Sequence, residues 1–264
     1  MVCIKREPPL DFTLDKYRVL CHTLQTNGYT PLTVRDFLNK KSIRSPAPET
    51  RIVILRHDVD RKITNALRMA NLEHELGIHS TYYFRYPSTF KPEIVREIEG
   101  LGHEIGYHYE VLSKAKGNPK KAIRFFEQEL SAMREVCDIK TICMHGSPLS
   151  RYDNRDLWKT YKFSSYNIVG EAFLSMHDSL YFTDTGRNWD NRNNLRDKNA
   201  SFNHVVGIKT TNDLLEFIHY KKPLFLYLTI HPERWAGTLM DYYSGCFLDF
   251  AINCGKRVLS RVLK

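Results

Sequence analysis

The sequence predicts an α/β protein built around a parallel sheet or barrel. Short β-rich runs alternate with amphipathic helical stretches along most of the chain, and two of those stretches end at a glycine, Gly77 and Gly100. The most polar motifs follow directly after the β-rich runs. In folds of this class the chemistry gathers at the carboxyl ends of the strands, so these motifs are the candidates for function.

The N-terminal segment, residues 1–48, is predicted to be a helical appendage. Helices are expected over residues 14–25 and 34–40, ahead of a Pro-rich stretch at 45–48. A segment of roughly 40–50 residues rarely builds an independent hydrophobic core. We therefore expect the appendage to pack on the main domain, residues 49–264.

The main domain is predicted to alternate strands and helices, from the periodicity of its apolar residues. The expected strands are 51–55, 79–84, 105–109, 141–144 and 224–230. The expected helices are 63–76, 92–99, 119–136, 213–219 and a closing helix at 249–262.

Composition and charge exclude several classes of protein. The 264 residues are 42% hydrophobic and 26% charged, which is typical of a globular protein and excludes disorder as the main state. With 39 Lys+Arg against 30 Asp+Glu, the net charge of +9 favours anionic partners such as phosphorylated or nucleotide-linked substrates. The basic residues form no long run, so nucleic acid is not an expected partner.

The expected location is the cytoplasm. The longest apolar run, residues 224–230, is far shorter than the roughly 18–20 residues that cross a bilayer, so no transmembrane segment is predicted. Charges and a Pro pair occupy the place where a signal peptide would have its apolar core. The six cysteines are widely spaced and include no Cys-x-x-Cys, which favours reduced, buried thiols.

Asp58 and Asp60 end the first strand of the main domain in the motif Arg-His-Asp-Val-Asp. Because side chains alternate along a strand, the two carboxylates leave on the same side. They repel each other unless a proton, a metal or a basic group lies with them. A divalent metal fills that role, with one carboxylate as ligand and the other free as a base. In the alternative, Asp60 caps the next helix and Asp58 pairs with Arg56 or Arg61.

His103 and His108 lie in the motif Gly-His-Glu-Ile-Gly-Tyr-His-Tyr-Glu, one βα unit further on. Imidazole and carboxylate groups are the usual ligands of zinc-like metals. Five residues apart in a strand, the two histidines face opposite ways, so they are not expected to bind one metal together. His108 and Glu110 are two apart and can face the same way.

Three motifs together resemble the polysaccharide deacetylase superfamily (NodB homology, carbohydrate esterase family 4). They are Arg-His-Asp-Val-Asp at 56–60, Gly-His-Glu-Ile-Gly-Tyr-His at 102–108 and Thr-Ile-His-Pro at 229–232. More narrowly, the chain is similar to divergent members of the RHDVD type, over roughly residues 51–235. The resemblance implies a distorted (β/α)7 barrel of NodB-homology type and a metal-dependent deacetylase.

The resemblance also implies roles for single residues. Asp58 matches the catalytic base and His231 matches the histidine that acts as general acid. Asp60 matches the metal-binding aspartate, and His108 matches the first histidine of the family's His-x-x-x-His pair. The implied cofactor is a divalent metal, expected to be Zn²⁺. His103 matches a position that is usually structural.

Two departures from the family pattern affect the metal site. The second ligand histidine would fall at position 112, where this chain has Leu112. The arginine-and-proline motif after the fourth strand is replaced by Met-His-Gly-Ser-Pro at 144–148. His145 is the predicted substitute ligand, with Glu110 as the local alternative and a loop-capping role for His145 still open. Without a third ligand, the fold would bind metal weakly and be catalytically silent.

Asp184, Arg187 and Trp189 are the predicted substrate contacts. They combine a flat apolar face with donors and acceptors, which suits a sugar or an anion. In the superfamily an aspartate and a tryptophan from this region help to orient the acid and line the pocket. The alternative is a turn with a Trp on the surface.

The leading functional hypothesis is a metal-dependent amide hydrolase that deacetylates an N-acetylated sugar or glycan precursor. A substrate met in the cytoplasm would be nucleotide- or lipid-linked, and the positive charge is compatible with a phosphorylated one. One alternative is a hydrolase of a small non-carbohydrate amide, which a pocket without aromatic sugar platforms would favour; Trp189 and Trp235 argue against it. Another is a catalytically silent binding module, supported by Leu112 and opposed by the intact Asp58, Asp60 and His231.

Overall fold

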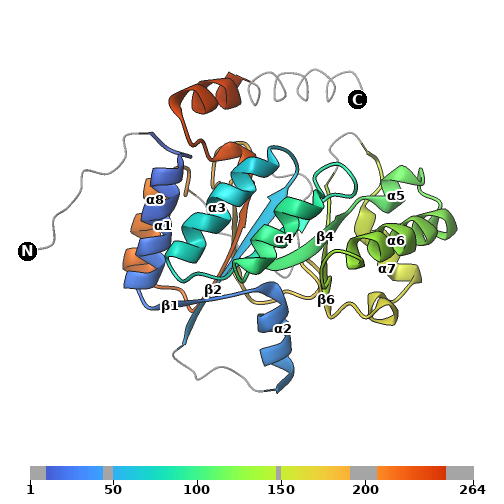
Figure 1. Ribbon diagram of the computed structural model, residues 1–264. Coiled ribbons are helices and arrows are strands. Elements are labelled where there is room, and N and C mark those ends of the chain that lie inside the picture. The colour runs from blue at the N-terminus through green and yellow to red at the C-terminus, as the bar shows by residue number, and fades with distance from the viewer. Residues whose placement is uncertain (1–9, 44–49, 147–149, 191–206, 248–264) are drawn as a thin grey trace, which may run out of the picture.

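The computed structural model describes residues 10–43, 50–146, 150–190 and 207–247, arranged as one curled parallel sheet with helices around it (Figure 1). The sheet has eight strands, and seven of them follow the order β6-β5-β4-β3-β2-β8-β7. The strands are β1 Tyr29–Leu32, β2 Arg51–Val59, β3 Thr81–Phe84, β4 Glu104–Tyr109, β5 Thr141–Met144, β6 Gly170–Glu171, β7 Leu180–Thr183 and β8 Phe225–Ile230. Every pairing in the sheet is parallel.

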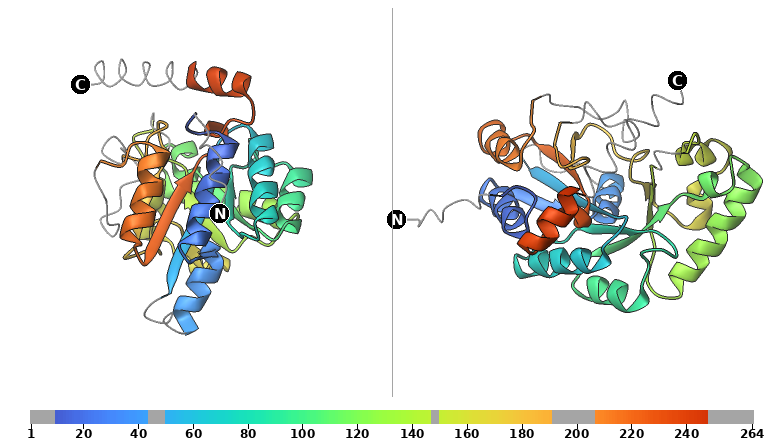
Figure 2. Two further views of the ribbon diagram at one scale, coloured as in Figure 1. Left: turned by 90° about the vertical axis from the view of Figure 1, so that its left-hand side faces the viewer. Right: turned by 90° about the horizontal axis from the view of Figure 1, so that it is seen from above.

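Helices surround the curved sheet, and most of them lie on its outer side, as the view from above shows (Figure 2). They are α1 Leu14–Thr26, α2 Val34–Ile43, α3 Ile63–Glu75, α4 Pro92–Gly100, α5 Val111–Lys114, α6 Pro119–Arg134, α7 Leu157–Thr160 and α8 Thr211–Lys221. The fold is a distorted (β/α) barrel, which confirms the predicted fold class. Its strands β6 and β7 are the two ends of the ordered path.

The predicted strands and helices that fall on described residues are all present, with small changes at their ends. Strand β2 is longer than expected and runs to Val59, so Asp58 lies within it. The structure adds the short elements β6, β7, α5 and α7. The predicted closing helix at 249–262 lies outside the described residues.

The N-terminal segment contains a strand as well as its two predicted helices. Strand β1 pairs with residues 51–54 of β2, and β3 pairs with residues 56–59 of β2. Strand β8 pairs with residues 52–57 of β2, so β1 and β3 share the other edge of that strand. Backbone hydrogen bonds therefore tie the segment to the sheet, in addition to the packing that the sequence predicts.

Local capping sets where the helices begin. Thr13 accepts a hydrogen bond from the backbone N–H of Lys16 at the start of α1. Asn118 does the same for Lys121 at the start of α6. Thr210 begins α8 through a reciprocal capping box with Asp213. These polar side chains satisfy backbone donors that have no partner within the helix.

A buried polar cluster lies behind strand β2, on the side opposite to Asp58. The carboxylate of Glu73, in α3, accepts hydrogen bonds from Tyr17, from Tyr82 and from His57 Nε2, the last at 2.7 Å. Burial alone would raise the pKa of Glu73, but the charge and hydrogen bond of His57 lower it to about 2. His103 belongs to this cluster, with Nδ1 3.7 Å from Glu73 Oε2. The cluster anchors α1 and α3 to the strand that carries the candidate site.

None of the described helices combines the length and the apolar character that a membrane crossing requires.

Candidate metal and acid–base site

The predicted site residues meet at one edge of the sheet, because neighbouring parallel strands end there. Asp58 lies in β2 and His108 lies in β4, while His145 and His231 directly follow β5 and β8. Asp60 follows β2 by one residue. The order of the sheet places β8 next to β2, and β4 next to β5. The chain positions that the sequence singled out thus converge.

Asp60, His108 and His145 direct their side chains toward one point. The Nε2 atom of His108 lies 3.4 Å from Asp60 Oδ1, and the Nε2 atom of His145 lies 3.5 Å from the same oxygen. One ligand atom from each residue falls within 4.8 Å of the others. Asp60 Oδ1 is buried and has no hydrogen bond of good geometry among the described residues. Two imidazole nitrogens and a carboxylate oxygen around one point match the three-ligand pattern of a catalytic zinc site.

The other ring nitrogen of each histidine is held by a partner. His108 Nδ1 lies 3.0 Å from the carbonyl oxygen of Cys143. His145 Nδ1 lies 2.9 Å from Glu110 Oε2, and its backbone N–H donates to the carbonyl of Tyr109 at 2.7 Å. Such contacts protonate Nδ1 and leave Nε2 as the donor atom for a metal. Both histidines are therefore oriented as ligands before any ion is present.

Glu110, the alternative third ligand, has a supporting role. Its carboxylate accepts from His145 and from Arg85, whose Nη2 lies 2.9 and 3.0 Å from the two oxygens. Burial opposes ionisation, but these hydrogen bonds lower the pKa of Glu110 to about 2. Leu112 is 5% exposed and packs in the hydrophobic core. The structure thus brings His145, rather than Glu110 or position 112, to the place of a third ligand.

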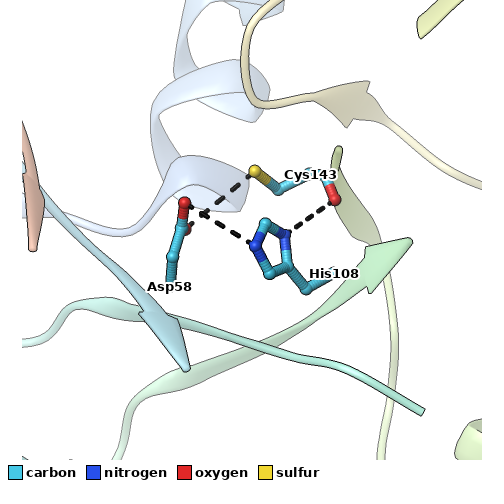
Figure 3. Close-up of side chains that lie close together, drawn as sticks. All are labelled: Asp58, His108 and Cys143. Atoms are coloured by element: carbon cyan, nitrogen blue, oxygen red, sulfur yellow. Dashed lines mark hydrogen bonds and ion pairs between the residues drawn. The ribbon is translucent and has the colours of Figure 1, made fainter. Parts of the chain in front are cut away.

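A second group of potential ligands lies beside the first. Figure 3 shows Asp58, His108 and Cys143, with Cys143 Sγ 4.0 Å from Asp58 Oδ1. Asp58 is already neutralised, because Arg56 donates from Nε to Oδ1 at 2.8 Å and from Nη2 to Oδ2 at 2.5 Å. Among the described residues, Asp60 lies instead against the imidazoles of His108 and His145. The donor set Asp60, His108 and His145 therefore fits a divalent ion better.

The pairing of Asp58 with Arg56 is the one that the sequence offered as an alternative. Burial would raise the pKa of Asp58, but the charges of Arg56 and then His108 lower it. Arg56 is fully buried; its guanidinium carbon lies 4.3 Å from the ring centre of Phe173. Capping by Asp60 is not observed, since Lys62 stands at the N-cap of α3 and makes no side-chain cap.

Replacing Arg56 by Met should lower the free energy of unfolding by about 3–5 kcal/mol, because it leaves the buried Asp58 carboxylate without its cation. Urea unfolding at neutral pH measures this change. The double variant Arg56→Met/Asp58→Asn removes both charges and should recover part of the loss. A single variant as stable as the wild type would show that Arg56 does not carry the charge balance of the site.

The His231 side chain is held by Asp184, which directly follows the neighbouring strand β7. Its Nδ1 lies 2.6 Å from Asp184 Oδ1, and its backbone N–H donates to Oδ2 at 2.9 Å. Arg234 and Trp235 also donate to Asp184, at 2.7 and 2.8 Å. Burial and Arg234 would lower the pKa of His231, but the charge and hydrogen bond of Asp184 outweigh them and raise it. The imidazolium is stabilised, as a general acid requires.

The structure places two of the three predicted substrate contacts, Asp184 and Trp189, in the protein interior. Asp184 is fully buried, and its carboxylate is occupied by the His231 turn. Trp189 is also fully buried: its Nε1 donates to Thr211 at 3.0 Å and its ring packs near Phe12. Arg187 Nη1 donates to the carbonyl of Arg234 at 2.6 Å, which braces the same turn. The surface Trp offered as an alternative is likewise absent at position 189, since a large indole gains more from burial in the core.

Arg56, Cys143, Glu233 and Arg234 are neighbours of the site to which the sequence assigned no functional role. Arg56 begins one recognised motif and Arg234 lies two residues after another, so a cation beside a buried carboxylate was the available signal. Glu233 is buried, and burial together with the charge of Asp60 raises its pKa to about 7.

No family model matches the chain, and no curated protein matches it. Among solved structures, it is similar to a family 4 carbohydrate esterase from Bacillus anthracis, with 13% identity over 89% of this chain and 85% of that one and a TM-score of 0.40. For a CE4 esterase from Streptococcus mutans the identity is 13%, the coverage 74% and 90%, and the TM-score 0.45. For a CE4 family pseudoenzyme from Bacillus anthracis the values are 13%, 80% and 66%, and 0.47.

The fold and the edge of the sheet together define the class: a (β/α) barrel with two imidazoles and carboxylates gathered at its strand ends. The solved structures named above belong to the carbohydrate esterase superfamily that the three sequence motifs resemble.

Proposed function

We propose that this protein is a metal-dependent amide hydrolase that removes an N-acyl group, in the simplest case N-acetyl, from an N-acylated sugar or glycan precursor. The observation that carries the proposal is the convergence of Asp60, His108 and His145 on one point. The Nδ1 atoms of the two histidines contact the carbonyl of Cys143 and the carboxylate of Glu110, which leaves both Nε2 atoms directed at that point. An oriented acid, His231, ends the strand next to β2.

Asp60, His108 and His145 would hold the ion, for which Zn²⁺ fits the donor set. When bound, a metal of this kind supplies a Lewis acid for the amide oxygen and lowers the pKa of a water molecule. Side chains of the protein carry out the remaining steps, which are proton transfers.

Asp58 and His231 divide the proton transfers between them. Asp58 Oδ2 lies 3.9 Å from His108 Nε2, beside the three ligands, and its lowered pKa keeps it in the ionised form that a base needs. It takes a proton from the attacking water. His231 donates a proton to the departing amine, which is a poor leaving group without one, and Asp184 stabilises the charge on the ring until then.

The structure weakens one alternative and supports another. The silent binding module rested on Leu112, and His145 now supplies a third donor. A hydrolase of a small non-carbohydrate amide gains support, because Trp189 and Trp235 are fully buried and neither indole is available to stack on a sugar ring. The net charge of +9 supports an anionic substrate, such as a phosphorylated sugar precursor in the cytoplasm.

Chelation of the metal should abolish amide hydrolysis, and added Zn²⁺ should restore it. The measurements are elemental analysis of protein purified without chelators and acetate release from N-acetylated sugars and sugar phosphates. We expect about one equivalent of metal per chain, as a single three-ligand site holds. Protein that binds no metal even in excess Zn²⁺ would refute the proposal. Metal-loaded protein that cleaves only simple amides would favour the non-carbohydrate alternative.

A further inference from the structure

Glu233 is a buried carboxyl group with one oxygen that lacks a partner. It lies in the short 3₁₀ turn Pro232–Arg234, two residues after His231. Its side chain is 5% exposed, and Oε1 lies 3.6 Å from Arg61 Nη2. Oε2 is buried and makes no hydrogen bond to any described residue. A buried acceptor without a hydrogen bond destabilises the folded protein, so its retention needs an explanation.

The position of Glu233 is fixed by its neighbours in the chain. Asn65, in α3, donates its side-chain amide to the carbonyls of Pro232 and Trp235 at 3.3 and 3.2 Å. The adjacent Arg234 is anchored on Asp184 at 2.7 Å. The turn is therefore held from both sides, and the carboxyl does not relax toward solvent to find a partner.

Glu233 lies beside the reacting groups and outside the metal ligands. Strands β2 and β8 are neighbours, so the turn after β8 adjoins Asp60, and Glu233 interacts electrostatically with both Asp60 and His231. It belongs to neither group of potential metal ligands among the described residues. A hydrogen bond from a bound molecule would satisfy Oε2 without any change in the metal site.

We propose that Glu233 binds substrate, with Oε2 hydrogen-bonded to a hydroxyl or amino group on the carbon framework next to the scissile amide. This inference rests on the proposed hydrolase and names its substrate class: an N-acylated amine with a neighbouring hydroxyl, as in an amino sugar, rather than a plain alkyl amide. Glu233 contributes binding and selectivity, while Asp58 and His231 carry the proton transfers.

Two probes separate this role from a merely structural one. N-acetylglucosamine and N-cyclohexylacetamide both carry an acetamido group on a six-membered ring, and only the first has hydroxyl groups. We expect Glu233→Leu, in the Zn²⁺-loaded full chain, to weaken binding of N-acetylglucosamine about tenfold, as the loss of a buried hydrogen bond does. In turnover this loss should appear mainly in KM. Binding of N-cyclohexylacetamide should stay unchanged, and Glu233→Gln, which keeps an acceptor, should recover part of the loss.

Binding is measured by ligand-observed NMR, and turnover by acetate release from the same two probes. Asp241→Asn, which changes an exposed carboxylate paired with Arg68, is the matched control and should leave both unchanged. If Glu233→Leu keeps its metal and fold but weakens both probes equally or neither, the inference is overturned while the hydrolase stands. If the wild type releases acetate from neither probe yet binds N-acetylglucosamine through Glu233, the inference is supported and hydrolysis of these amides is refuted.

Discussion

His145→Ala is expected to remove bound metal and to lower amide hydrolysis by more than about 100-fold. The reason is that it deletes one of three ligands, which costs more than the roughly 10–100-fold loss that follows removal of a residue merely supporting a ligand. The Nε2 atoms of His145 and His108 lie at similar distances, 3.5 and 3.4 Å, from the same oxygen of Asp60. Elemental analysis and Zn²⁺ titration of the purified variant measure the effect.

Two further variants sharpen this test. His219→Ala removes an exposed imidazole from α8 and should leave metal content and activity unchanged. Leu112→His restores the family's His-x-x-x-His spacing, but its side chain lies in the hydrophobic core, so it should fail to rescue His145→Ala and should cost stability. Full metal content in His145→Ala, or rescue by Leu112→His, would assign the third ligand elsewhere.

Asp184→Asn is expected to lower kcat/KM by about 100-fold or more, within the range that general acid catalysis contributes. The variant keeps the shape of the side chain but loses the charge that raises the pKa of His231. Burial and Arg234, which lower that pKa, are then opposed only by the weaker effect of Glu233, so we expect His231 to lose its proton at a lower pH. Because the acid acts in its protonated form, the alkaline limb of the pH–rate profile should move to lower pH.

The pH profile of kcat/KM, recorded with metal-saturated protein, measures this shift. Asp156→Asn, which changes a half-exposed carboxylate paired with Lys159, should leave the limb in place. Metal content should be retained in Asp184→Asn, since Asp184 belongs to neither group of potential ligands among the described residues. An alkaline limb that stays where it is would show that His231 is not the acid.

Patterns within the sequence sufficed for the fold class and for the location of the site. The alternation of β-rich and amphipathic runs predicts β2 through β5 and β8 with the helices between them, because strand and helix periodicity are local properties. The rule that parallel strands end at one edge then predicts that Asp58, His108 and His231 meet. Strand β1 was not predicted, because a four-residue strand between two helices is too short to show the alternation of apolar and polar residues that is typical of a strand.

Only the tertiary structure shows which side chains the site residues contact. The choice of His145 over Glu110 as the proposed third ligand rests on a 2.9 Å contact between these two residues, which are 35 positions apart. The burial of Asp184 and Trp189 depends on Arg234, Trp235 and Thr211, which lie far along the chain. A sequence motif indicates which polar side chains are present. Packing determines which of these side chains can face a ligand and which form hydrogen bonds with one another. By itself, then, the sequence determined the α/β barrel and the residues at its strand ends. The structure decided which of these residues contact one another and which are buried, because the cost of burying a polar group depends on partners brought together only by folding.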